Sequence, residues 1–438
     1  MGLCLPDGRY RHYDGRRAVP RPDNPLAAYV AVTAAYWAFM LTDGALRMLV
    51  LLHFNALGFS PIQLAYLFIL YEIAGIITNL CAGWIAARFG LTSTLYAGLG
   101  LQVVALLALT QLDPAWSVVA SVAFVMCIQG ASGVAKDLSK MSSKSAVKLL
   151  APEGGGLFRW VALLTGSKNA VKGAGFFLGT LFLGWLGFDA SLLIMAAVLA
   201  TILVAVALFM PRGLPTGRKG AKFSDVFSID ANVIRLSAAR VFLFGARDVW
   251  FVVGIPIFFY SVLSDGTPEG NRAAFFMIGT FMAAWIIGYG AVQAAAPKIL
   301  GGAARPVADV ARAASPWAWG VSAIPAVLAG VAFIMDGGVT LALIVAAGLL
   351  AFGVVFAVNS ALHSYLILAF TKDERVTMDV GFYYMSNAAG RLLGTLLSGV
   401  SYQVGGLPLC LATAALMAAL SAFAARGLGQ SEPPPETE

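Results

Sequence analysis

Long apolar stretches recur along almost the whole chain, and short polar stretches separate them. A helix needs about 20 apolar residues to cross the hydrocarbon core of a bilayer. Short segments of alternating polarity, which would indicate a transmembrane barrel, do not occur. The pattern predicts an all-α protein with twelve membrane-spanning helices, at residues 26–52, 61–87, 91–112, 115–138, 159–185, 189–210, 236–262, 273–296, 316–335, 338–370, 378–403 and 406–425.

The amino-acid composition agrees with a membrane protein. Hydrophobic residues make up 59% of the chain and charged residues 12%, whereas soluble domains carry about 25% charged residues. A basic segment precedes the first span without a small-residue cleavage site, so we interpret it as a disordered tail and not as a signal peptide. The predicted organisation is a tail at 1–25, a six-helix bundle at 26–210, a cytoplasmic loop at 211–235, a second six-helix bundle at 236–425 and a tail at 426–438.

Lysine and arginine are distributed unevenly between the two sides of this topology. With the N-terminus in the cytoplasm, 22 of the 29 basic residues are counted on the cytoplasmic side, including Lys136 at the end of the fourth span and Lys140 after it. Arg272 is the one basic residue in the outer loops, and six lie within spans. Cytoplasmic enrichment of Lys and Arg is the normal bias of membrane proteins. One missed span would destroy the alternation, so the count predicts an even number of spans and cytoplasmic termini.

The two halves of the chain show a faint internal repeat. Gly44-Ala45 followed by Arg47 in span one is similar to Gly245-Ala246-Arg247 in span seven. Asn169-Ala170 in span five is similar to Asn387-Ala388 in span eleven. Spans one and seven, and five and eleven, are equivalent positions in a parallel repeat of six helices. The two halves of the major facilitator fold have this relation, and we predict that fold.

The loop after the second span carries a partial motif. Gly83, Arg88 and Gly90 match Gly-x-x-x-Asp-Arg-x-Gly of facilitator proteins, but Ala87 stands at the aspartate position. Arg88 is therefore either a gating residue or a plain cytoplasmic anchor. Gly-xxx-Gly patterns at 175–179 and 390–394 predict close helix packing.

Charged side chains inside the predicted spans are unusual, because charges are costly there and normally face a protein interior or a wet cavity. Cations exceed anions by three, which favours a multivalent anionic solute. An exporter of organic cations would show the opposite sign. The cations are Arg47, Lys168, Lys172, Arg240, Arg247 and Arg391, and the anions are Asp43, Glu72 and Asp248.

Five of these cations are candidates for substrate binding. A guanidinium can pair through two hydrogen bonds with a phosphate, arsenate or carboxylate group. The alternative is that the cations only neutralise the intramembrane acids, a role that we favour for Arg240. Arg391 has no acid near it in the sequence, whereas Arg247 is next to the gating candidate Asp248. Arg391 is therefore the strongest candidate among Arg47, Lys168, Lys172, Arg247 and Arg391.

Three titratable residues are candidates for proton coupling. Asp43 and Glu72 are acids within spans, although either could be a simple ion-pair partner. His363 could titrate near neutrality, although it could equally be a structural histidine. Proton antiport is the favoured coupling, and uniport driven by the membrane potential is the alternative.

Other chemistries have little support in the sequence. The four cysteines form no CxxC pair and no metal-ligand spacing, so buried thiols are more plausible than a site for a soft metal or arsenite. No enzyme motif, cofactor motif or metal cluster is present. We expect a monomer that has the lipid bilayer as its surroundings and no nucleic-acid partner.

Several charged stretches resemble the ArsJ family, which are organoarsenical efflux permeases of the major facilitator superfamily. The resemblance covers about residues 26–425 and rests on Leu41–Val50, Tyr71–Glu72, Gly133–Ser142, Leu164–Lys172, Phe244–Phe251, Val358–Tyr365 and Asp379–Tyr384.

The resemblance implies a substrate and a location. The substrate is 1-arseno-3-phosphoglycerate, which glyceraldehyde-3-phosphate dehydrogenase makes when it accepts arsenate in place of phosphate. Export across the bacterial inner membrane lets this unstable ester hydrolyse outside and confers arsenate resistance. The alternatives are a transporter of ordinary phosphorylated or carboxylated metabolites, a thiol-dependent arsenite exporter, and a membrane enzyme.

Overall fold

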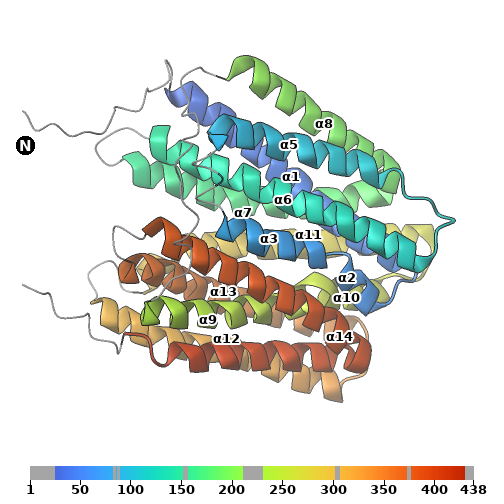
Figure 1. The fold of residues 1–438 in the computed structure, drawn as a ribbon. Coiled ribbons are helices and arrows are strands. Elements are labelled where there is room, and N and C mark those ends of the chain that lie inside the picture. Colours follow the sequence, from blue (N-terminus) through green and yellow to red (C-terminus); the bar gives the residue numbers. More distant parts are fainter. Residues whose placement is uncertain are drawn as a thin grey trace, which may run out of the picture.

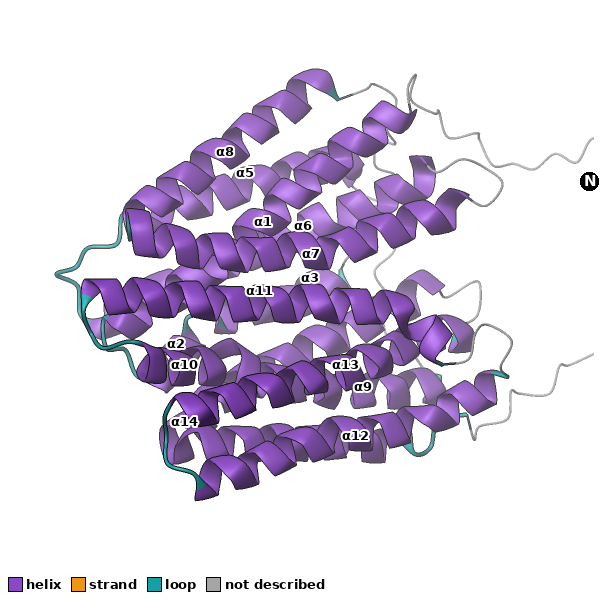
Figure 2. Cartoon of the chain, turned by 180° about the vertical axis from the view of Figure 1, so that it is seen from behind, coloured by secondary structure: helices purple, strands orange, loops and turns teal. Residues whose placement is uncertain are grey.

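A computed structural model describes residues 25–81, 85, 89–150, 156–210, 230–300, 306–371 and 376–429. Its described secondary structure is helical throughout (Figure 2). The helices are α1 (Pro25–Ala56), α2 (Pro61–Tyr66), α3 (Ile69–Leu80), α5 (Leu91–Leu109), α6 (Val118–Leu150), α7 (Gly156–Leu186), α8 (Phe188–Phe209), α9 (Ala231–Val249), the π-helix η1 (Trp250–Gly254), α10 (Ile255–Leu263), α11 (Pro268–Ile299), α12 (Val307–Ile334), α13 (Val339–Phe370) and α14 (Val376–Ala425).

The described residues contain ten helical segments that are long and apolar enough to span a membrane. The 31-residue α7 is not among these ten. The 50-residue α14 is counted once, although Gly405 and Gly406 have non-helical backbone angles and Pro408 follows them. The predicted number of twelve spans is therefore not contradicted, and it stays a prediction.

The helices run roughly parallel to one another in two groups (Figure 1). Helices α1, α5, α6, α7 and α8 occupy one side, and α9, α12, α13 and α14 occupy the other. Helices α2 and α3 belong with the first group by sequence, and α11 belongs with the second. The groups meet where α7 packs along α11 and where α2 and α3 pack along α14. Helix α1 begins and α14 ends at the same end of the molecule, as an even number of crossings requires.

Local sequence explains where several helices begin and change. The Asp230 carboxylate accepts hydrogen bonds from the backbone N–H groups of Asn232 and Val233, and so caps α9. Pro256 has no N–H group to continue the α-helical hydrogen bonds, and the chain before it forms the π-helix η1. Gly406 has a φ of 59°, a conformation that favours glycine, at the turn within α14.

The two Gly-xxx-Gly patterns lie at close helix contacts, as predicted. A side chain at Gly179 would overlap the backbone of Ala45 in α1. A side chain at Gly390 would overlap the carbonyl oxygen of Val241 in α9. These glycines let α7 approach α1, and α14 approach α9, to backbone contact. The neighbours of the central charged residues are thereby set by packing.

Two predicted boundaries differ from the structure, and other predicted segments lie outside the described residues. Helix α6 continues to Leu150, so the fourth span does not end at residue 138 and Lys136 does not lie in a cytoplasmic loop. Helix α9 begins at Ala231, inside the predicted central loop. The tail at 1–24, most of the central loop and Arg88 lie outside the described residues.

Candidate functional site

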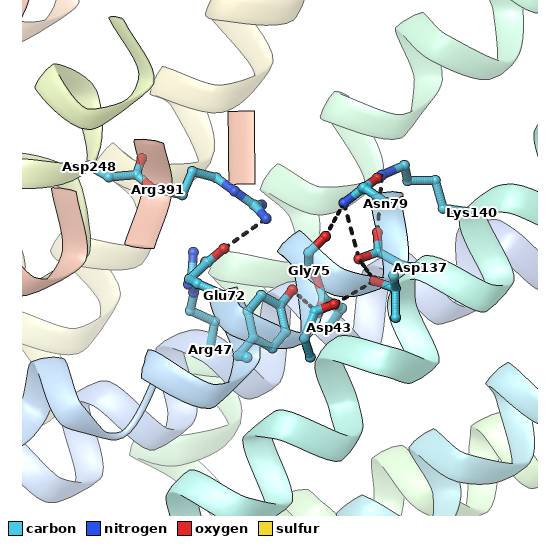
Figure 3. A network of polar contacts seen from close by, with 12 residues as sticks. Asp43, Arg47, Glu72, Gly75, Asn79, Asp137, Lys140, Asp248 and Arg391 are labelled. Atoms are coloured by element: carbon cyan, nitrogen blue, oxygen red, sulfur yellow. Dashed lines mark hydrogen bonds and ion pairs between the residues drawn. The ribbon is translucent and has the colours of Figure 1, made fainter. Parts of the chain in front are cut away.

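Glu72 in α3 lies at the centre of a buried charge network that joins three helices (Figure 3). Its Oε1 atom is 2.9 Å from Nη2 of Arg47 in α1. Its Oε2 atom is 2.7 Å from Nη2 of Arg391 in α14. The Glu72 side chain is 0% exposed. One carboxylate therefore pairs with an arginine from each half of the chain.

Asp43 in α1 forms the second acidic position. The Tyr71 hydroxyl donates a hydrogen bond of 2.6 Å to its Oδ1 atom. Nζ of Lys172 in α7 lies 3.6 Å from its Oδ2 atom. The Arg47 guanidinium also lies 5.2 Å from the centroid of the Tyr71 ring. Asp43 and Glu72 thus share one continuous set of cationic partners.

Arg247 and Asp248 form the third part of the network. Nε of Arg247 donates a hydrogen bond of 2.6 Å to Oδ1 of its neighbour, and Asp248 is fully buried. Lys172 lies within electrostatic range of Arg47, Arg247 and Arg391. The structure therefore brings four of the five substrate-binding candidates together.

Lys168 lies on α7 one turn before Lys172 and is half-buried.

The sequence argument that ranked Arg391 above Arg247 does not hold in three dimensions. Arg391 has no acid nearby along the chain, but folding places Glu72 against it. Arg247 is paired with Asp248 at a similar distance, 2.5 Å. Arg247 thus has its own carboxylate, whereas Arg391 shares Glu72 with Arg47, so both guanidiniums have an acidic partner in this conformation.

Lys136 in α6 is a member of the network that the sequence interpretation missed. It is 5% exposed, and its Nζ atom lies 4.0 Å from the centroid of the Tyr71 ring without a hydrogen-bond partner. Buried serines such as Ser132 and Ser139 lower the hydropathy of α6 here, and Lys136 was therefore counted with the cytoplasmic lysines at the end of the span. Continued helical spacing of small residues was the available signal.

Asp137, the next residue in the sequence, was also missed, and it connects α3 with α6 (Figure 3). It is fully buried and accepts a 2.7 Å hydrogen bond from Thr78 and a 3.0 Å hydrogen bond from Lys140. Lys140 also donates to Asn79 at 2.6 Å. This arrangement fixes the two helices against each other and accounts for two charged side chains inside the bundle.

Arg240 in α9 lies in a separate polar cluster. Its Nη1 atom donates to the carbonyl and hydroxyl oxygens of Ser360 at 3.1 Å, and its Nε atom donates to Asn387 at 3.2 Å. His363 in α13 lies within electrostatic range of Arg240 and is fully buried. The proton-coupling candidate His363 is thus placed apart from Asp43 and Glu72, next to a cation.

The three cysteines within the described residues have different surroundings. Cys127 is exposed, Cys81 is half-buried, and buried Cys410 donates a hydrogen bond to the Val249 carbonyl. Over the part of the chain that the structure describes, no group of three His, Cys, Asp or Glu residues could hold a metal ion.

No protein-family model matches the chain, and no curated protein matches it. Solved transporter structures do match its fold. A POT family transporter in complex with 5-aminolevulinic acid has a TM-score of 0.67 at 13% identity, over 92% of this chain and 97% of that chain. A mutant of the nucleoside transporter NupG has a TM-score of 0.66 at 16% identity, over 92% and 98%.

Another POT family structure, in complex with a thioalcohol-conjugated peptide, has a TM-score of 0.66 at 12% identity, over 90% and 94%. These likenesses extend over nearly the whole chain and show its fold. The chain has the all-α, multi-pass fold of the major facilitator transporters, as the sequence predicted. The particular family, ArsJ, stays a prediction.

Proposed function

We propose that this protein is a secondary transporter that exports the anionic organoarsenical 1-arseno-3-phosphoglycerate across the inner membrane and so confers arsenate resistance. The excess of cations in the central network carries the proposal. Six cations face four acids there, and the cations come from both halves of the chain. The cations are Arg47, Lys136, Lys140, Lys172, Arg247 and Arg391, and the acids are Asp43, Glu72, Asp137 and Asp248. A low-dielectric site with excess positive charge favours a multivalent anion. The ArsJ resemblance supplies the identity of that anion.

The shared carboxylate suggests how a solute would act. An anionic group that binds Arg391 competes with Glu72 for the same guanidinium. When the anion displaces Glu72 from Arg391, the ion pair between α3 and α14 is lost. The two groups of helices then have one link fewer. Solute binding thereby favours a different arrangement of the halves, as alternating access requires.

This geometry changes the coupling that we expected. Protonation of Glu72 releases Arg391 for an anion, and an anion on Arg391 leaves Glu72 free to take a proton. Each event favours the other, by linkage. Positive linkage does not suit the antiport expected from the sequence, in which the proton and the anion bind in alternation. For export, uniport driven by the membrane potential is consistent, since it contributes ~2.3 kcal/mol per charge per 100 mV.

Transport in everted vesicles tests this coupling directly. Uptake of the arseno-ester should respond to an imposed potential and should not require an inward-directed or outward-directed pH gradient. Uptake that depends on proton counterflow would instead support the antiport expected from the sequence, with Glu72 or Asp43 as the proton carrier. The same vesicles test the alternative substrate class, because preferential uptake of 3-phosphoglycerate would identify a transporter of ordinary phosphorylated metabolites.

Arg391→Ala tests the site in cells. An arsenate-sensitive host that expresses the dehydrogenase should lose resistance with Arg391→Ala and keep a small part of it with Arg391→Lys, which retains the charge without the bidentate geometry. Arg312→Ala is the matched control, because Arg312 is an exposed arginine in α12. Full resistance with a membrane-inserted Arg391→Ala protein would refute the site.

Replacement of Cys81, Cys127 and Cys410 by serine distinguishes the arsenite exporter. The proposed oxyanion export needs no thiol, so arsenate resistance should remain. Its loss at normal protein levels would instead indicate thiol-dependent chemistry.

A further inference from the structure

Arg240 is a buried cation whose described contacts include no carboxylate. It is 4% exposed, and its hydrogen-bond acceptors are the neutral oxygens of Ser360 and Asn387. The rings of Phe244 and Tyr383 lie 4.0 Å and 4.9 Å from its guanidinium carbon. A buried charge without a counter-charge is costly, so an anion from outside the chain would stabilise this position.

Two polar side chains near this guanidinium have no hydrogen-bond partner. Both ring nitrogens of His363 and both amide atoms of Asn359 are buried without a hydrogen bond, and the Tyr383 hydroxyl is buried beside Ser364. His363 and Asn359 are four residues apart on α13, so they share one face of that helix. An imidazole, an amide nitrogen and a phenol can each donate a hydrogen bond to an oxyanion. Buried groups of this kind normally have partners.

The Arg240 cluster is close to the central network. The Phe244 ring lies between the two, with its centroid 4.0 Å from the guanidinium carbon of Arg240 and 4.8 Å from that of Arg247. The two guanidinium carbons therefore cannot be farther apart than the sum of these distances. A chain of three carbons with an oxyanion at each end is of suitable length to reach both.

We propose that Arg240, Asn359, His363 and Tyr383 form a second anion site, and that the solute carries an oxyanion at each end of a short chain. One end binds at Arg247 and the central network, and the other end binds at Arg240. This inference rests on the proposed transport of 1-arseno-3-phosphoglycerate and adds that the two oxyanions of the solute bind at separate sites. Because Arg240 is buried here, the solute reaches it in another conformation of the alternating-access cycle.

Two synthetic probes measure the second site separately from the first. They are propyl phosphate, with one phosphate, and 1,3-propanediol bisphosphate, with two. Calorimetry on the full chain in nanodiscs gives both dissociation constants. We expect the wild type to bind the bisphosphate at least ~10-fold more tightly, the factor that corresponds to ~1.4 kcal/mol.

Two variants remove the second site in different ways. Arg240→Gln removes the cation. Asn387→Asp keeps the side-chain shape and places a carboxylate on Arg240 Nε, where the amide oxygen is now 3.2 Å away. Each variant should bring the ratio of the two dissociation constants close to one and leave the affinity for propyl phosphate unchanged. Arg235→Gln, on the exposed side of the same helix, should change neither.

The outcomes separate this inference from the proposed function. If both variants keep the preference for the bisphosphate, the Arg240 cluster holds only internal water and the inference is wrong. If both affinities fall equally in Asn387→Asp while its melting temperature is retained, the cluster supports the fold of the first site and is not a site itself. If the wild type binds neither probe, the proposed anion transport fails instead.

Discussion

Glu72→Gln tests whether the shared carboxylate competes with the solute. The substitution keeps the shape of the side chain and removes the negative charge that Arg47 and Arg391 share at 2.9 Å and 2.7 Å. Removal of one partner from a buried ion pair costs about 3–5 kcal/mol, because the other partner stays buried without a counter-charge. We therefore expect the variant to melt at a lower temperature than the wild type in the absence of anion.

An added anion should recover part of this loss. Propyl phosphate that binds the released arginines replaces the missing negative charge. If its binding recovers ~1.4 kcal/mol of the lost stability, its dissociation constant is ~10-fold lower in the variant than in the wild type, and a recovery of ~2.8 kcal/mol corresponds to ~100-fold. Calorimetry in nanodiscs measures the dissociation constant, and thermal unfolding with and without probe measures the recovery. Asp309→Asn is the control, because its carboxylate pairs with Arg312 on the exposed surface. The control should change neither quantity.

Weaker or unchanged anion binding by a folded Glu72→Gln protein would refute this reasoning. It would mean that Glu72 holds the arginines in a binding geometry and does not compete with the solute for them. The positive linkage between anion and proton would then also be withdrawn.

Two further predictions concern packing and the missed lysine. Lys136→Met should raise the melting temperature, because it removes a buried ammonium that has no hydrogen-bond acceptor. The same substitution should weaken propyl phosphate binding several-fold. A lower melting temperature would show that the cation stabilises the fold. Gly390→Val should destabilise the protein by about 1–3 kcal/mol, because its side chain would overlap the Val241 carbonyl of α9. Gly330→Val on α12 meets open space and should be tolerated in the same unfolding assay.

The sequence by itself determined the fold class and most helix positions. A bilayer forces the backbone of a long apolar segment into a helix, because unpaired N–H and C=O groups have no water to bind. That requirement is local, and it can be applied to each segment separately. The close-packing glycines at 179 and 390 were equally readable, since their spacing places them on one helix face.

The sequence also identified most charged residues of the central network, because any charge within an apolar span is exceptional. It could not give their partners. Arg391 lacks an acid along the chain but meets Glu72 across the boundary between the two groups of helices. Which faces of which helices meet is decided by packing between distant segments, and no local pattern records it.

Tertiary structure alone decided the surroundings of Lys136 and Arg240. Lys136 looked like a cytoplasmic anchor, because small polar residues lower the hydropathy of α6, yet the helix continues and buries it. Arg240 looked like a neutralising partner for an acid, yet neutral oxygens and two aromatic rings surround it. A charge shows in the sequence, whereas the presence or absence of its counter-charge depends on the folded neighbours from other helices.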